Sequence, residues 1–96
     1  MEFNDYLKTL LREKDLSKAE LGRRIRKTQP YIYHLCRGTK PVPRPDVMSA
    51  IAKALDASKA ETQKLMDYSY QRVLGKYAKF LDQSSFGKVL EKKKRY

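Results

Sequence analysis

The fold is decided between residues 16 and 38, which read LSKAELGRRIRKTQPYIYHLCRG. Residues 17–20 (SKAE) match a capping box, in which the serine hydroxyl accepts from the third helical amide and the glutamate reaches back to the cap amide. A helix should therefore begin just after the serine. Leu21 and Ile25 lie on its apolar face together with Gly22, whose small size lets another helix approach closely.

A second, shorter helix follows in the same stretch. Thr28 is its cap, and Pro30 fits only in a first turn, because its missing N–H would have no intrahelical partner there anyway. Ile32 and Leu35 fall on the buried side, and Gly38 stands just past the end, where glycine commonly closes a helix. Two capped helices joined by about three residues are what a helix-turn-helix requires.

Three further helices are expected around this stretch. Asp15 ends the first of them, since aspartate tolerates left-handed backbone better than most residues. Pro45 opens another at its first position, and residues 58–61 (SKAE) form a second capping box that opens the last. Their apolar positions recur at three- and four-residue steps, at Phe3, Leu7, Leu10, Leu11, Met48, Ile51, Ala52, Leu55, Leu65 and Met66.

Charge points to a polyanionic partner. The chain has 96 residues, enough for one domain, and its 22 Lys and Arg residues against 11 acids leave a net charge of +11. Nucleic acid and an anionic membrane face are the ordinary partners of such a surface. No apolar run approaches the ~20 residues of a membrane span, and the first residues do not read as a leader, so we expect a soluble, cytoplasmic protein without membrane association.

Catalytic and metal chemistry lack the residues they need. Cys36 is the single cysteine, so an internal disulfide is excluded, and no Cys/His cluster has the spacing of a zinc site. There is no glycine-rich phosphate loop, no carboxylate pair spaced for acid and base work, and no nucleophile with a plausible base. We expect a protein that is not an enzyme and that binds no metal and no cofactor.

The helices and their motifs together resemble the lambda-repressor-like (Cro and phage-repressor type) helix-turn-helix family over roughly residues 3 to 66. The resemblance is carried by Leu16-Ser17-Lys18-Ala19-Glu20-Leu21-Gly22, Ile25, Thr28-Gln29, Tyr31-Ile32, Leu35, Arg37-Gly38 and Ile51-Ala52-Lys53-Ala54-Leu55. It implies an all-α, five-helix DNA-binding domain, usually a two-fold dimer, whose third helix enters the major groove of double-stranded DNA.

Four positions depart from the family pattern, one of them Lys27, which stands where an apolar residue often follows the turn. Arg26 occupies the turn position that is commonly glycine, so the turn either carries a left-handed penalty of ~1 kcal/mol or adopts another geometry. Lys18 replaces a frequent glutamine and supplies a point charge suited to phosphate. Pro30 stands where a polar side chain is common in the third helix, and its apolar ring suits a thymine methyl group.

Four residues of the third helix are candidates for reading bases: Gln29, Pro30, Tyr33 and His34. Gln29 offers a donor and an acceptor together, which match adenine N6 and N7, and such a pair discriminates by ~1–3 kcal/mol. Tyr33 and His34 lie about one turn further along the same face, and each can donate or accept. The competing interpretation is that they are ordinary surface or partly buried side chains.

A second set of residues is expected at the DNA backbone, where contacts fix register without reading sequence. Arg44 precedes Pro45 and cannot cap its helix, so a phosphate would satisfy the free amides there. Five of the candidates are cations, and each of them, taken alone, is equally well interpreted as a solvated surface charge. The phosphate-binding candidates are Ser17, Lys18, Lys27, Thr28, Arg37, Lys40 and Arg44.

The last third of the chain is more basic than the rest. Residues 1–67, the expected helix-turn-helix domain, carry net +5, whereas residues 68–96, a helical extension, carry net +6. An apolar stripe for dimerisation runs along this extension through Tyr70, Val73, Leu74, Tyr77 and Leu81. Docking of the stripe onto its own domain is the alternative. The stripe either prolongs the fifth helix or builds a sixth, and Gly75 speaks against one unbroken helix.

These observations predict a sequence-specific DNA-binding transcriptional regulator, a repressor that acts as a homodimer on a near-palindromic operator. One alternative is a DNA-binding antitoxin or mobile-element accessory factor that grips a protein partner through residues 68–96. Another is a protein-interaction or membrane-surface module in which the basic tail is the working part.

Overall fold

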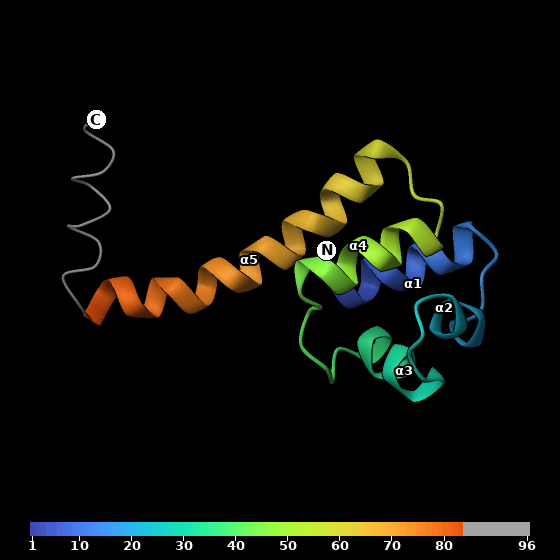
Figure 1. Cartoon of the computed structure of the whole chain (residues 1–96), viewed down its shortest axis with the longest axis horizontal. Helices are drawn as coiled ribbons and strands as arrows, with labels where there is room; N and C mark the ends of the chain where they lie inside the picture. Colours follow the sequence, from blue (N-terminus) through green and yellow to red (C-terminus); the bar gives the residue numbers. More distant parts are fainter. Residues whose placement is uncertain (84–96) are drawn as a thin grey trace.

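The computed structural model describes residues 1–83, with side chains described as far as Gly75, and in this part of the chain it is all-helical. Figure 1 shows the short helices gathered into one body and a long helix that projects past it. The helices are α1 (Phe3–Glu13), α2 (Lys18–Arg24), α3 (Gln29–Arg37), α4 (Pro45–Ala54) and α5 (Lys59–Gln83). The predicted fold class is confirmed.

Local side-chain caps set the ends of α2 and α3 as predicted. The Ser17 hydroxyl accepts from the Glu20 amide at 3.0 Å, and the Thr28 hydroxyl accepts from the Tyr31 amide at 3.3 Å. Gly38 closes α3 in left-handed backbone with φ of 78°. Each cap satisfies backbone groups that the helix itself leaves unpaired. The position of each helix end is therefore set by residues next to it in the sequence.

The two SKAE boxes behave differently. At the start of α5 the box is reciprocal, because the Glu61 carboxylate also accepts from the Ser58 amide at 2.8 Å. That bond, with the Lys14 ammonium 2.9 Å away, lowers the pKa of Glu61. The carboxylate of Glu20, expected to reach back in the same way, turns instead to the guanidinium groups of Arg23 and Arg24, which offer charge-assisted hydrogen bonds.

The core lies between α1 and the other helices. α3 packs against α1 and α2, and α4 packs against α5 and α2. Ile25 and Met66, both expected inward, are only half-buried, while Tyr6 and Cys36 join the core in addition. The predicted core residues that are buried are Phe3, Leu7, Leu10, Leu11, Leu21, Ile32, Leu35, Met48, Ile51, Ala52, Leu55 and Leu65.

Three connections use left-handed backbone without glycine, at Asp15, Arg26 and Asp56. Asp15, with φ of 52°, follows the end of α1 as expected. Arg26 has φ of 59°, so the turn between α2 and α3 keeps the geometry for which glycine is best suited. The turn therefore carries the left-handed penalty.

Arg26→Gly should raise the free energy of unfolding by about 0.5–1 kcal/mol, because glycine adopts left-handed backbone without strain. Part of the stabilisation is offset, because glycine has more conformational freedom than arginine in the unfolded chain. Urea denaturation of the two proteins measures the difference. Arg23→Gly, inside α2, is the matched control and should lower the stability by about 1 kcal/mol. A loss of stability in both variants would contradict the strain assigned to Arg26.

The fifth helix is continuous from Lys59 to Gln83 and passes through Gly75 without a break, so the apolar stripe prolongs this helix and does not build a sixth. A Cβ at Gly75 would meet nothing within 4 Å, which places this residue in open space. Among residues 1–83, no helix combines the length and apolarity that crossing a membrane requires. Residues 84–96, the end of the extension expected over residues 68–96, lie outside the described residues.

Tyr68 and Ser69 keep the middle of α5 in contact with the body. Tyr68 packs edge-on against Phe3, with ring centroids 5.8 Å apart, and its hydroxyl donates to the carbonyl of Met1. Ser69 is fully buried. The part of α5 just after residue 67 therefore packs on α1 and on the loop before α4, and the domain boundary expected at that residue stays a prediction.

Candidate nucleic-acid interface

One side of α3 faces solvent while the other faces the core. Gln29 and Pro30 are exposed in its first turn, Tyr33 is 41% exposed, and His34 is half-buried one turn later. α3 lies at the edge of the body, on the side away from α5 (Figure 1). The four candidate base readers thus lie on the outward part of a single short helix, as the sequence predicts.

Tyr33 stands between two cations. The Arg37 guanidinium donates to the Tyr33 hydroxyl at 2.7 Å and lies 5.5 Å from the ring centroid, and the Lys18 ammonium lies 5.6 Å from the same centroid. Since a guanidinium only donates, the phenol oxygen is an acceptor in this pair, and its own proton is free to point away from the protein. Tyr33 can therefore donate a hydrogen bond to DNA. The matching acceptors are guanine N7 and O6, thymine O4 and a phosphate oxygen.

His34 is held by Thr39. Its Nδ1 lies 2.8 Å from the Thr39 hydroxyl, and that hydroxyl also lies 3.3 Å from the His34 carbonyl. A hydroxyl has one proton, so both contacts are satisfied when Nδ1–H donates to Thr39 and Thr39 donates to the carbonyl. In that tautomer Nε2 is an acceptor, which suits the amino groups of adenine and cytosine. Thr39 was not among the residues predicted for the site; the signal for it was a hydroxyl residue directly after the closing Gly38.

Tyr31 lies on the flank of α3 and not on its outward face. It is half-buried against the core, and the ammonium groups of Lys27 and Lys40 lie 5.7 and 5.9 Å from its ring centroid. Burial raises the pKa of Tyr31, and the nearby positive charge of Arg72 opposes that rise. Tyr31 thereby brings two cations to one edge of α3.

Five cations on α2, on α3 and in the connections that flank α3 are called here the cation rim. They are Lys18, Lys27, Arg37, Lys40 and Arg44. Lys18 is half-buried and the other four are exposed. Arg44 makes no side-chain cap for α4, as expected, so the first amides of α4 have no such partner. The Ser17 and Thr28 hydroxyls accept from their helix amides and keep a proton for a phosphate oxygen.

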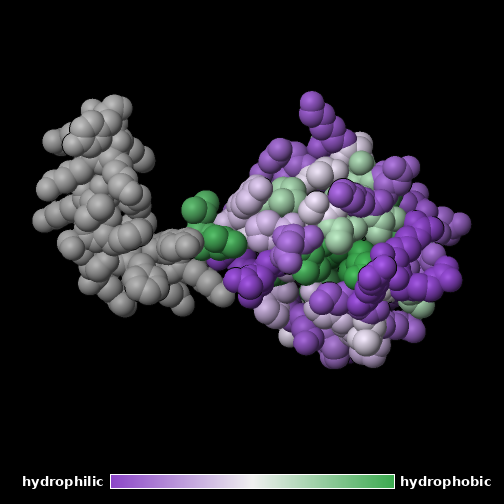
Figure 2. Space-filling model, in the orientation of Figure 1, coloured by the Kyte–Doolittle hydropathy of each residue, from purple (hydrophilic) through white to green (hydrophobic). Residues whose placement is uncertain are grey.

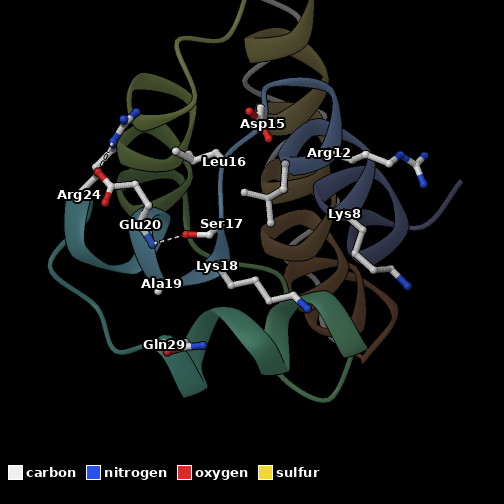
Figure 3. A pocket seen from close by; sticks show the side chains of 11 residues that line it. Lys8, Arg12, Asp15, Leu16, Ser17, Lys18, Ala19, Glu20, Arg24 and Gln29 are labelled. Atoms are coloured by element: carbon white, nitrogen blue, oxygen red, sulfur yellow. Dashed lines mark hydrogen bonds and ion pairs between the residues drawn. The ribbon is translucent and has the colours of Figure 1, made fainter.

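A depression of about 900 Å³ continues the rim onto α1. Its lining includes Lys8 and Arg12 of α1 as well as Lys18 and Gln29, and Figure 3 shows Lys8 and Lys18 extending over the same side as the Gln29 amide. Lys8 also pairs with Asp5 at 3.3 Å. Lys8 and Arg12 were not among the residues predicted for the site. Their spacing of four places both cations on one face of α1, which was the signal for them.

The apolar stripe expected for dimerisation is exposed in part. Tyr70 and Leu74 are 47% and 64% exposed, whereas Val73 is half-buried. Figure 2 shows an apolar patch where α5 leaves the body. The side chains of Tyr77 and Leu81 lie outside the described residues.

Among residues 1–75, whose side chains are described, no cluster of three or more His, Cys, Asp or Glu side chains could bind a metal ion. Cys36 is buried on the inner side of α3, and burial raises the pKa of its thiol. Cys36 and His34 point to different sides of α3, as their spacing of two predicts.

Comparison with known protein families yields a match over most of the described residues. Residues 2–65 match a family model described as a helix-turn-helix domain. The matched segment contains α1 to α4 and the beginning of α5, and with them Gln29, Tyr33 and every residue of the cation rim. No curated protein and no solved structure matches the chain.

Proposed function

The chain belongs to the helix-turn-helix family of DNA-binding domains, and from this premise we propose that it is a sequence-specific transcriptional regulator of the lambda-repressor-like type. The observation that carries the proposal is the outward face of α3, where polar side chains stand between the cations of the rim. A short helix with polar tips suits the major groove, and cations on both sides suit the two strands.

Base reading is assigned to the outward face of α3. Gln29 is exposed in the first turn and can bond adenine N6 and N7, and Pro30 beside it can meet a thymine methyl group. Tyr33 donates to a base acceptor, and His34 accepts from a base amino group through Nε2. Phosphate binding is assigned to Ser17, Thr28 and the cation rim.

As a repressor, the protein would act as a homodimer that covers a promoter. The exposed Tyr70 and Leu74 on α5 support pairing of two copies through the apolar stripe. A two-fold dimer would bind a near-palindromic operator with half-sites ~34 Å apart, one helical turn of DNA.

Gln29→Ala and Arg37→Ala should affect DNA binding in different ways. Gln29→Ala removes a base contact and should relax the preference for one base pair by ~1–3 kcal/mol, with little effect on unrelated sequences. Arg37→Ala removes a phosphate contact and the partner of the Tyr33 hydroxyl, so it should weaken binding to all sequences.

Selection of bound sequences from random oligonucleotides, followed by gel-shift titration of the selected site and its single-base variants, measures both effects. Lys53→Ala, an exposed cation on α4 outside the rim, is the control and should leave affinity and preference close to wild type. Equal losses on every sequence for Gln29→Ala would remove the base-reading role of this residue.

The exposed apolar residues of α5 also favour a second candidate, a DNA-binding antitoxin or accessory factor whose extension grips a different protein. Leu74, the more exposed of the two, is as suitable for a foreign partner as for a second copy. Light scattering of the purified chain separates the two cases. A dimer mass favours the repressor, whereas a monomer that co-purifies from its native cell with a stoichiometric second polypeptide favours the accessory factor.

A further inference from the structure

The loop between α3 and α4 contains two backbone carbonyls that need hydrogen-bond donors from elsewhere in the protein. Residues 39–44 read TKPVPR, and its two prolines have no N–H to donate. The carbonyls of Val42 and Pro43 have no helix or strand partner, yet Pro43 is buried and Val42 is half-buried. Buried carbonyls require donors, so some other element has to supply them.

Helix α5 supplies both donors. The Ser69 hydroxyl donates to the Pro43 carbonyl at 2.7 Å, and the Arg72 guanidinium donates to the Val42 carbonyl at 2.6 Å. Ser69 and Arg72 are three residues apart and so share one face of α5. Ser69 is the only polar side chain in the described part of the chain that is buried, which marks this contact as an exception in an otherwise apolar core.

The loop held in this way is the one that carries cations of the rim. Lys40 and Arg44 lie just before and just after the two clamped carbonyls, and Lys40 extends over the Tyr31 ring of α3. The positive charge of Arg72 also opposes the rise that burial causes in the pKa of Tyr31.

We propose that Ser69 and Arg72 are positioning residues for DNA binding, which clamp the loop of residues 39–44 so that Lys40 and Arg44 are presented to DNA phosphates. Arg72 lies two residues and Ser69 five residues before the exposed Leu74, at the place where α5 leaves the body. The extension is thereby mechanically joined to the DNA-facing loop. The inference rests on the proposed DNA binding.

Arg72→Met in the full chain tests the clamp, since methionine keeps apolar length and loses every donor. Binding to the selected site should weaken roughly tenfold, the size of a typical coupling between contacting groups. The log-log salt slope should fall in magnitude by about 1, as for one lost phosphate contact. Lys53→Met is the charge-matched control and should change neither quantity.

A double-mutant cycle with Lys40→Ala distinguishes positioning from direct contact. If Arg72 acts through the loop, Lys40→Ala should cost less in the Arg72→Met background than in the wild type. Purely additive losses would overturn the proposal, because they would mean that Arg72 contacts phosphate by itself or stabilises the fold in general.

Amide chemical shifts of Thr39, Lys40, Val42 and Arg44 supply a readout that does not need DNA. In Arg72→Met they should move while those of α1 stay in place, and unchanged loop shifts would overturn the clamp. Ser69→Ala should shift the same amides; if that variant fails to fold, Arg72→Met carries the test. Loop shifts in a chain that binds no DNA would retain the clamp and reject the proposed function.

Discussion

Gly22→Val should destabilise the protein by about 3 kcal/mol, the upper end of what overpacking costs. A Cβ on Gly22 would lie 2.9 Å from the Lys27 carbonyl oxygen and 3.3 Å from that of Thr28. Both are backbone atoms of the turn between α2 and α3, and the Lys27 amide already bonds the Gly22 carbonyl at 2.8 Å. The backbone cannot yield without separating the two helices, and valine adds two further methyl groups.

Urea and thermal denaturation measure this loss, which for a domain of this size corresponds to about 12–24 °C in Tm. Gly22→Ala should have a smaller effect, because the better helix propensity of alanine offsets part of the clash. Gly75→Ala is the open-space control: with nothing within 4 Å, it should stabilise the protein by up to about 1 kcal/mol. A Gly22→Val protein as stable as the wild type would contradict the close approach of α2 and α3.

Raising the salt concentration from 50 to 200 mM should weaken binding to the operator by about 1,000-fold, which corresponds to a log-log slope near −5. The cation rim supplies five positive charges around α3, and the free amides at the start of α4 offer one further phosphate site. Neutralising about six phosphates releases the condensed counterions that produce this slope. The effect is large because it sums over the whole rim.

Titrations at several salt concentrations, on the operator and on unrelated DNA, measure the slope. Each alanine substitution at Lys27, Lys40 or Arg44 should reduce its magnitude by about 1, whereas Lys53→Ala should leave it unchanged. A slope near −2 for the wild type would mean that most of the rim is solvated surface charge. The depression lined by Lys8 and Arg12 adds a further check, because a slope steeper than −6 would bring α1 into the DNA contact.

Much of the fold follows from interactions within a few residues along the chain. The hydroxyls of Ser17 and Thr28 cap helices that begin directly after them, and Gly38 ends a helix directly before it. Asp15 could be assigned to a turn because its conformational preference is local. Once the two ends of α3 are known, the helical period places Gln29 and Tyr33 on its outward side. The candidate base readers could therefore be predicted from the sequence.

Local patterns were less reliable where two partners compete. Glu20 has the spacing to close its capping box, yet the guanidinium groups of Arg23 and Arg24 take its carboxylate and lower its pKa. Gly75 reads as a helix breaker, yet α5 continues through it. A glycine weakens a helix by only about 1 kcal/mol, which the flanking residues can offset.

The sequence by itself determined where α2 and α3 begin, the glycine that ends α3 and the outward face of α3, because a cap or a helical period acts over at most one or two turns. Only the tertiary structure decided what lies beside that face. Arg72 reaches the carbonyl of Val42 and Ser69 reaches that of Pro43, across 30 and 26 residues of chain, and Lys8 lines the same depression as Lys18. Contacts between residues so far apart depend on how whole helices pack, and packing is a property of the assembled core rather than of any one segment.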